Sequence, residues 1–164
     1  MPKVAIIMGS KSDLPIVEGT IKILKNFGVD TEVHVISAHR TPDVAARFAQ
    51  NAQKNEFEVI IAAAGKAAHL PGVLAAYTTL PVIGLPIKSS TLDGLDSLLS
   101  IVQMPSGVPV ATVAINGWEN AALLAIQILA IKYSQLSKKL EDYKTKMAQN
   151  VILQDKNIQG EVII

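Results

Sequence analysis

The stretch KVAIIMGSKSDLPIVEGTIKILKNFG, residues 3–28, contains one complete strand–loop–helix unit. Residues 3–8 are a short apolar run that ends at Gly9, which is typical of a buried β-strand. The apolar residues of the following segment recur at the spacing of one helical face: Leu14, Val17, Ile21, Leu24 and Phe27. Gly28 then ends the helix. The unit therefore predicts a strand that feeds a helix through a short polar loop.

The rest of the chain repeats this alternation. Further strands are predicted at residues 31–36, 57–64, 81–85 and 109–115. Further helices are predicted over 42–55, where Thr41 would cap and Pro42 begin the helix, and over 70–77, 93–103 and 118–148. Five alternations predict an α/β fold, a three-layer αβα sandwich around a five-stranded parallel sheet in the flavodoxin-like order 2-1-3-4-5. In that order the loops after the first three strands converge on one cleft.

Composition limits the classes of function. The chain has 164 residues, which suits a single domain over 1–164, and 49% of them are apolar. Its net charge of +1 gives no basic face for nucleic acid. The absence of cysteine excludes disulfides and thiolate chemistry, and the three scattered histidines form no metal set. No apolar run is long enough for a signal peptide or a membrane span, so we expect a cytoplasmic protein.

The loop after the first strand contains Gly9, Ser10, Ser12 and Asp13. Glycine allows close approach of a ligand, and serine hydroxyls with helix-start N–H groups suit a phosphate. Asp13 could accept hydrogen bonds from sugar hydroxyls. The alternative is purely structural, with Ser12 or Asp13 capping the helix.

The loop after the second strand reads Ser37-Ala38-His39-Arg40-Thr41-Pro42. His39 can exchange a proton near neutral pH, and Arg40 can hold a phosphate with two parallel N–H donors. A solvated surface loop is the alternative. His34, in contrast, lies within a strand pattern between two valines, and we expect it to be structural.

The loop after the third strand is rich in small residues. Its candidate ligand-binding residues are Ala64, Gly65, Lys66, Ala67, His69 and Leu70. Small side chains leave backbone N–H groups open to a planar or anionic ligand, although they also suit tight packing of a strand against a helix. His69 could bond a ligand or cap the helix. Further along, Ser89, Ser90 and Thr91 resemble a loop and cap that could reach the cleft, and Asp93 and Asp96 resemble helix-start charges.

The carboxyl-terminal part of the chain predicts contacts between subunits. Residues 119–131, ENAALLAIQILAI, are apolar almost all round, whereas a surface helix has a polar stripe. We therefore expect the helix and tail over about 118–164 to pack on neighbouring subunits, with the end Glu161–Ile164 docking there; burial within one subunit is the alternative.

Taken together, these motifs resemble one family. MGSKSD, SAHRTP, AAGKAAHLPG, SLLSIVQMPSGVPVATVAI and ENAALLA, in this order and over about residues 3–131, are similar to the class I N5-carboxyaminoimidazole ribonucleotide mutases, in the phosphoribosylaminoimidazole carboxylase catalytic subunit family. The resemblance implies an isomerase of purine (IMP) biosynthesis that converts N5-carboxyaminoimidazole ribonucleotide to 4-carboxy-5-aminoimidazole ribonucleotide. It also implies no metal and no cofactor, and a homo-oligomer, usually an octamer.

The resemblance assigns expected roles to residues of this chain. Ser10, Ser12 and Asp13 would hold the ribose phosphate, with Ser37 and Arg40 completing the phosphate site. His39 would be the general acid and base. The loop over 64–70 would surround the carboxylate and the ring.

Two positions of the third loop depart from the family. The third loop usually reads GAGGAAHLPG, so Ala63 and Lys66 stand in place of glycines. The Lys66 cation could hold the substrate carboxylate or block entry, and a positive φ there would cost about 1 kcal/mol or more. A related class carboxylates aminoimidazole ribonucleotide directly, but its loops tend to read SAHKT and lack AAHLPG. Direct carboxylation and a non-catalytic nucleotide-binding module remain the alternatives.

Overall fold

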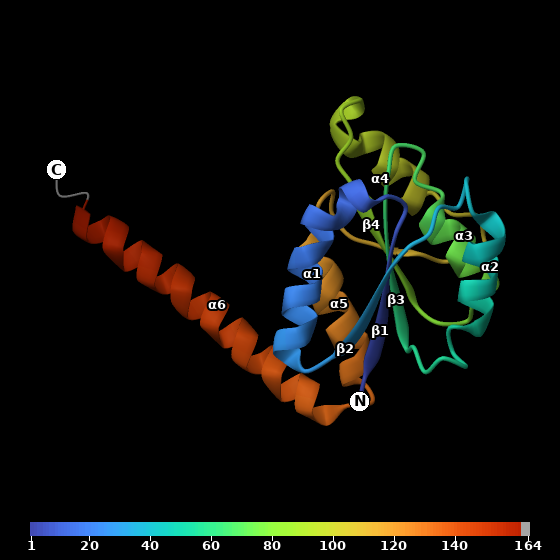
Figure 1. Ribbon diagram of the computed structural model, residues 1–164. Helices are drawn as coiled ribbons and strands as arrows, with labels where there is room; N and C mark the ends of the chain where they lie inside the picture. Colours follow the sequence, from blue (N-terminus) through green and yellow to red (C-terminus); the bar gives the residue numbers. More distant parts are fainter. Residues whose placement is uncertain (162–164) are drawn as a thin grey trace.

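A computed structural model describes residues 1–161 of the chain. Its centre is a five-stranded, all-parallel sheet in the order β2-β1-β3-β4-β5, which confirms the predicted flavodoxin-like topology (Figure 1). The strands are β1 (Lys3–Met8), β2 (Asp30–Val35), β3 (Val59–Gly65), β4 (Val82–Ile87) and β5 (Ala111–Thr112). Because all five run in one direction, their carboxyl ends meet at one edge of the sheet.

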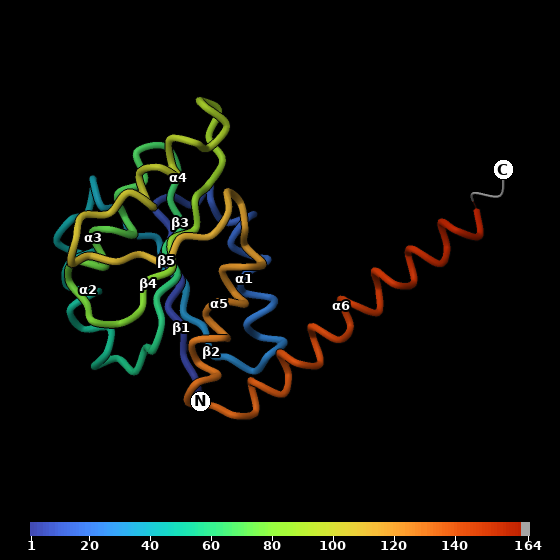
Figure 2. Tube along the Cα trace, turned by 180° about the vertical axis from the view of Figure 1, so that it is seen from behind, coloured from blue at the N-terminus to red at the C-terminus, as the bar shows by residue number. Residues whose placement is uncertain are grey.

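Helices cover both faces of the sheet. One face packs against α1 (Leu14–Phe27) and α5 (Trp118–Ala130), and the other against α2 (Pro42–Asn51), α3 (Leu70–Tyr77) and α4 (Leu95–Val102) (Figures 1 and 2). Alternate residues of each central strand point into the two cores. Ile6 and Ile61 therefore lie in the core under α1 and α5, while Ile7 and Ile60 lie in the core under α2 and α3.

Element boundaries depart from the prediction mainly at β5, the outermost strand of the sheet. The predicted strand over 109–115 is reduced to Ala111–Thr112, which pairs only with Ile83 and Gly84 of β4. The last strand of the order has a neighbour on one side only, so little pairing holds its ends. The helix predicted from Pro42 to Asn55 ends at Asn51, and short 3-10 turns, η1 (Lys11–Asp13) and η2 (Leu92–Gly94), precede α1 and α4.

The single helix predicted over 118–148 is wrong. The chain forms α5 and then a separate helix, α6 (Ser134–Glu161), with a turn at residues 131–133. Glu58, just before β3, contacts this turn: its carboxylate accepts hydrogen bonds from Lys132 Nζ at 2.9 Å and from Tyr133 OH at 2.7 Å. These bonds hold the chain at the amino edge of the sheet, so α6 leaves in a new direction.

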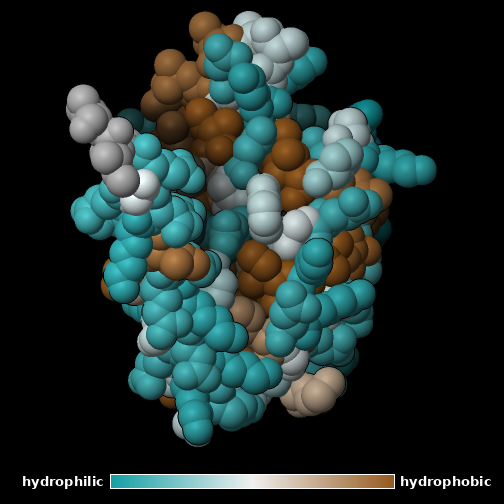
Figure 3. All heavy atoms as spheres, turned by 90° about the vertical axis from the view of Figure 1, so that its left-hand side faces the viewer, coloured by the Kyte–Doolittle hydropathy of each residue, from teal (hydrophilic) through white to brown (hydrophobic). Residues whose placement is uncertain are grey.

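The described part of α6 extends well away from the sheet (Figures 1 and 2). Only its first turns contact the core, through buried Leu136 and partly buried Leu140 and Tyr143. Seen from the side to which α6 projects, hydrophilic side chains cover most of the lower part of the molecule, and hydrophobic side chains gather in the upper part (Figure 3). Of the tail expected to dock on a neighbour, Glu161–Ile164, Glu161 is the last residue of α6, and Val162 to Ile164 lie outside the described residues.

Much of the apolar surface of α5 is buried within its own subunit, which is the alternative to the subunit contacts expected for this helix. Ala121, Ala122, Ala125, Ile126 and Leu129 are buried within the same subunit, against α1 and the sheet. Over residues 1–161, no helix combines the length and the apolar character that crossing a membrane requires.

Candidate active site

A cavity of about 640 Å³ opens at the carboxyl edge of the sheet. All fourteen residues predicted for the site line it: Gly9, Ser10, Ser12, Asp13, Ser37, Ala38, His39, Arg40, Ala64, Gly65, Lys66, Ala67, His69 and Leu70. The last residue of β4, Ile87, and the three that follow it, Lys88, Ser89 and Ser90, also line it. The strand order brings this fourth loop to the cavity, because β4 is the neighbour of β3.

The first loop is closed by Ser10, and neither Ser12 nor Asp13 caps the following helix through its side chain. Ser10 has an extended backbone, and its Oγ accepts hydrogen bonds from the Ser12 amide at 3.3 Å and the Ser12 hydroxyl at 2.9 Å. A Cβ on Gly9 would meet no atom within 4 Å, so this backbone is open toward the cavity. The loop thus presents hydroxyls and an accessible backbone to a ligand.

Asp13 is the single carboxylate among the described residues that line the cavity. The residue is only 9% exposed. Burial raises the pKa of its carboxyl group, and a backbone hydrogen bond from Ser10 opposes that shift only in part. A desolvated carboxylate with no capping role gains most from hydroxyl donors, such as those of a sugar.

Arg40 joins the loops that follow β1 and β2. Its Nη2 donates to the carbonyl of Gly9 at 3.3 Å, and its Nε donates to Ser37 Oγ at 3.4 Å. Of the five N–H groups of a guanidinium, three remain free for a ligand. Thr41 is the residue before α2, but its side chain does not make the predicted capping bond. Instead its Oγ1 closes the loop, because it donates to the Ser37 carbonyl and accepts from the Ser37 amide.

The two histidines of the cavity are in direct contact. His39 Nε2 lies 2.7 Å from His69 Nδ1, and the rings meet edge to face at 77°. One ring must donate and the other accept, so the contact contains a single shared proton. His69 stands at the amino end of α3 but makes no side-chain capping bond. The structure therefore brings together two imidazoles from the loops after β2 and β3, in a position to transfer a proton.

His34 lies elsewhere. Its ring packs against Phe48 with centroids 5.1 Å apart, its Nε2 lies 3.5 Å from Glu32, and it does not line the cavity.

Lys66 follows the last residue of β3 and has a left-handed backbone, with φ of 56°. A lysine in this conformation costs about 1–2 kcal/mol relative to an ordinary backbone, whereas glycine adopts it readily. The side chain is exposed and lines the cavity. Within residues 1–161 it makes no hydrogen bond or ion pair, so its charge is available to a ligand.

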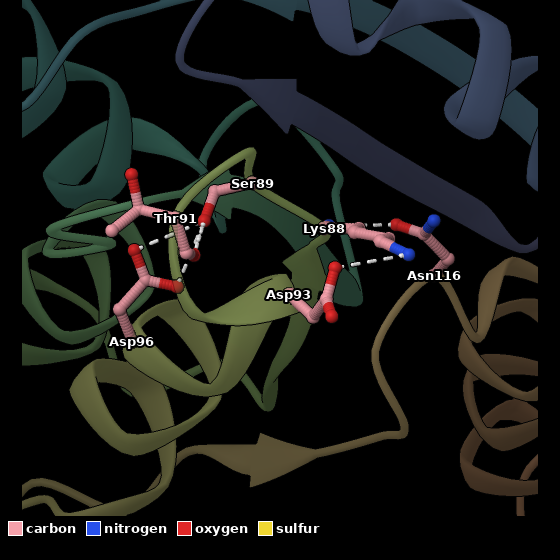
Figure 4. A network of polar contacts seen from close by, with 6 residues as sticks. All are labelled: Lys88, Ser89, Thr91, Asp93, Asp96 and Asn116. Atoms are coloured by element: carbon pink, nitrogen blue, oxygen red, sulfur yellow. Dashed lines mark hydrogen bonds and ion pairs between the residues drawn. The ribbon is translucent and has the colours of Figure 1, made fainter.

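The loop after β4 is organised by a polar network (Figure 4). Ser89 Oγ lies 3.0 Å from Asp96 Oδ1 in the first turn of α4, and the Lys88 amide donates to Asn116 Oδ1 at 2.9 Å. Lys88 Nζ pairs with Asp93 at 3.2 Å. Asp96 is thus at a helix start, as predicted, and in addition binds the loop that borders the cavity.

The charges of the cavity favour an anionic ligand. Arg40, Lys66 and Lys88 provide cations against the single carboxylate of Asp13. The cavity therefore suits a small molecule that combines anionic groups with hydroxyls and undergoes proton transfer next to an imidazole.

Comparisons with known proteins agree with this arrangement. The family model "AIR carboxylase" matches residues 3–150. N5-carboxyaminoimidazole ribonucleotide mutase of Thermotoga maritima is 58% identical over 152 residues, covering 93% of this chain and 89% of its own. The enzyme of that name from Pyrococcus abyssi is 62% identical over 147 residues, covering 90% and 84%.

Solved structures show the same fold. PurE of Treponema denticola is 28% identical and superposes with a TM-score of 0.88, over 96% of this chain and 98% of its own. The type II dehydroquinase of Propionibacterium acnes, at 14% identity and a TM-score of 0.55, shares the fold alone. With a family model that matches nearly its whole length, the chain belongs to the AIR carboxylase family.

Proposed function

We propose that this chain is an N5-carboxyaminoimidazole ribonucleotide mutase of purine biosynthesis, with 4-carboxy-5-aminoimidazole ribonucleotide as its product. Relatives with that name are 53–62% identical over most of the chain. The observation that carries the proposal is the His39–His69 contact at 2.7 Å, in a cavity where Arg40 has free N–H groups. A ribonucleotide has an anion for the guanidinium and a heterocycle for the imidazoles.

The substrate would lie across the carboxyl edge of the sheet. The phosphate binds Arg40 and the hydroxyls of Ser10, Ser12 and Ser37, because charge-assisted hydrogen bonds to phosphate are strong. The ribose hydroxyls donate to Asp13. The aminoimidazole and its carboxylate lie against the small residues of the loop over 64–70, near the two histidines.

A single imidazole can then serve both halves of the reaction. Protonated His39 delivers a proton to the carbamate nitrogen, the bond from nitrogen to the carboxyl carbon breaks, and carbon dioxide leaves. The ring carbon attacks carbon dioxide while the cavity retains it. Neutral His39 removes the proton from that ring carbon, which restores the aromatic ring and the starting charge of the histidine. His69 orients the His39 ring through their shared proton.

The decisive experiment is conversion of N5-carboxyaminoimidazole ribonucleotide by the purified protein, followed by the absorbance of the product. Turnover that is independent of bicarbonate supports the mutase. A bicarbonate requirement with aminoimidazole ribonucleotide as substrate would instead support direct carboxylation, and binding without conversion would support a nucleotide-binding module.

A pair of histidine variants tests the assigned role. His39→Asn removes the proton donor and should abolish turnover while ligand binding persists. His34→Asn is the matched control, because that ring lies outside the cavity, and it should turn over normally. Turnover by His39→Asn near the unsubstituted rate would refute the assignment.

The proposal includes a cytoplasmic homo-oligomer, an octamer as the resemblance implies. Support comes from α6, on which Val151, Ile152, Leu153 and Ile158 are each more than half exposed. An amphipathic surface that one chain does not cover is suited to a second copy of the chain. Light scattering should give a mass several times 17.5 kDa at micromolar concentration, and a monomer would contradict the proposal.

A further inference from the structure

We propose that Lys66 recognises the carboxylate that migrates during the reaction, and so makes the site selective for carboxylated ribonucleotides over the decarboxylated aminoimidazole ribonucleotide. The inference rests on the proposed function and adds the group that this lysine binds. The backbone provides the first indication. Lys66 occupies a left-handed conformation, at φ of 56°, in which glycine would be relaxed. Strain of this kind at a cavity wall is an indication of function.

The position of Lys66 separates it from the phosphate end of the cavity. Arg40 is held between Gly9 and Ser37, on the loops that follow β1 and β2. Lys66 follows β3 and stands three residues before His69, whose ring contacts His39. The two cations therefore lie on different strand loops, and Lys66 shares its loop with the proton-transfer pair.

The charges of the cavity leave Lys66 available. Lys88, the other lysine of the cavity, is paired with Asp93 at 3.2 Å. Asp13, the carboxylate that lines the cavity, belongs to the loop after β1. Lys66 forms no ion pair with any residue from 1 to 161. A substrate with a second anion beside its ring supplies the missing partner.

The chemistry indicates which kinetic parameter depends on Lys66. Substrate and product both have a carboxylate, whereas the carbon dioxide between them is neutral. A cation that holds the carboxylate until carbon dioxide separates stabilises the ground state and the transition state of bond cleavage about equally, which is uniform binding. Loss of Lys66 should therefore raise KM and leave kcat nearly unchanged. Because the side chain is exposed, we expect an effect of about tenfold.

Three substitutions separate charge from backbone strain. Lys66→Asn and Lys66→Gly remove the cation but tolerate the left-handed backbone, so the loop is retained. Lys66→Arg keeps the cation. Lys54→Asn is the control for net charge, because Lys54 is an exposed lysine that does not line the cavity.

The experiment measures KM and kcat, and the dissociation constants of two ligands by titration calorimetry. The ligands are 4-carboxy-5-aminoimidazole ribonucleotide and aminoimidazole ribonucleotide, and the titrations use the His39→Asn background, which blocks turnover. We expect Lys66→Asn and Lys66→Gly to weaken the carboxylated ligand about tenfold and the decarboxylated ligand less than twofold. Lys66→Arg, which keeps the cation, should retain the preference for the carboxylated ligand, and Lys54→Asn should behave like the parent chain.

Equal weakening of both ligands would overturn the inference, because the lysine would then contact a shared group such as the phosphate. Unchanged or tighter binding of the carboxylated ligand would overturn it as well. If the unsubstituted protein turns over its substrate and the selectivity does not move, only the role of Lys66 fails. If the unsubstituted protein does not turn over N5-carboxyaminoimidazole ribonucleotide, the proposed function fails and this inference with it.

Discussion

Replacing Arg40 by alanine removes the guanidinium that joins the first two loops of the cavity. Two of its five N–H groups are occupied, by the Gly9 carbonyl at 3.3 Å and Ser37 Oγ at 3.4 Å, which leaves three for a phosphate. A hydrogen bond to a charged group contributes about 1.5–3 kcal/mol. Two such bonds at the lower end, chosen because the side chain is exposed, amount to about 3 kcal/mol, or roughly a hundredfold in affinity.

The assay compares the product nucleotide with the corresponding nucleoside, both titrated into His39→Asn protein so that no turnover interferes. Arg40→Ala should weaken the nucleotide roughly a hundredfold and the nucleoside hardly at all, since the nucleoside has no phosphate to lose. Arg40→Lys keeps the positive charge but loses the bidentate geometry of the guanidinium, so its affinity for the nucleotide should lie between those of Arg40→Ala and the parent. Equal losses for nucleotide and nucleoside, or no loss for either, would show that the guanidinium does not bind the phosphate.

Three other predictions concern stability. Burial raises the pKa of Asp13, so the contribution of the protonated carboxyl group to stability is full below the unfolded pKa and is lost as pH rises through the folded pKa. Asp13→Asn should therefore raise the Tm at pH 7 but not at pH 3, and a lower Tm at pH 7 would contradict this. A Cβ on Gly84 would lie 2.3 Å from Ile101 Cγ2, so Gly84→Ala should lower the free energy of unfolding by about 2–3 kcal/mol in denaturant titrations. In the double variant with Ile101→Ala, the total loss should be smaller than the sum of the two single losses by at least about 1 kcal/mol, and strict additivity would exclude the clash. Desolvation opposes ionisation of Glu58, but the hydrogen bonds from Lys132 and Tyr133 outweigh it and lower the pKa of the carboxyl group. The stability that this carboxylate confers is therefore present above the unfolded pKa and is lost as pH falls through the folded pKa. Glu58→Gln should flatten the fall in Tm between about pH 5 and 3, and identical acid profiles of the variant and the parent would count against this role.

Much of the fold could be predicted from the sequence because local signals and packing agree. The run over 4–8 is apolar throughout, and the structure buries these residues of β1 on both faces, between two helical layers. Gly28 has a φ of 80°, the left-handed conformation expected where a helix ends. The break after α5 could not be predicted, since residues 131–133 include neither glycine nor proline and the turn is bonded to Glu58, 74 residues before Lys132.

The candidate site was predictable in its membership but not in its contacts. Parallel strands end at one edge, so the residues of three loops had to meet there. That His39 and His69 would touch could not be inferred, because the contact depends on the rotamers of two rings thirty positions apart. Of the loop after β4, Ser89 and Ser90 reach the cavity, as the sequence allowed, whereas Lys88 was not expected there and its place follows from the position of β4 beside β3.

Helix α6 has a consequence for how the protein behaves on dilution. Most of the stability of a helix in a protein comes from tertiary packing, and from Tyr143 to Glu161 this helix has no support from the core of its own chain. Its order would then come from other copies, so that helical content measured by circular dichroism should decline as the protein is diluted. The amount of protein present would in this way determine the shape of each molecule.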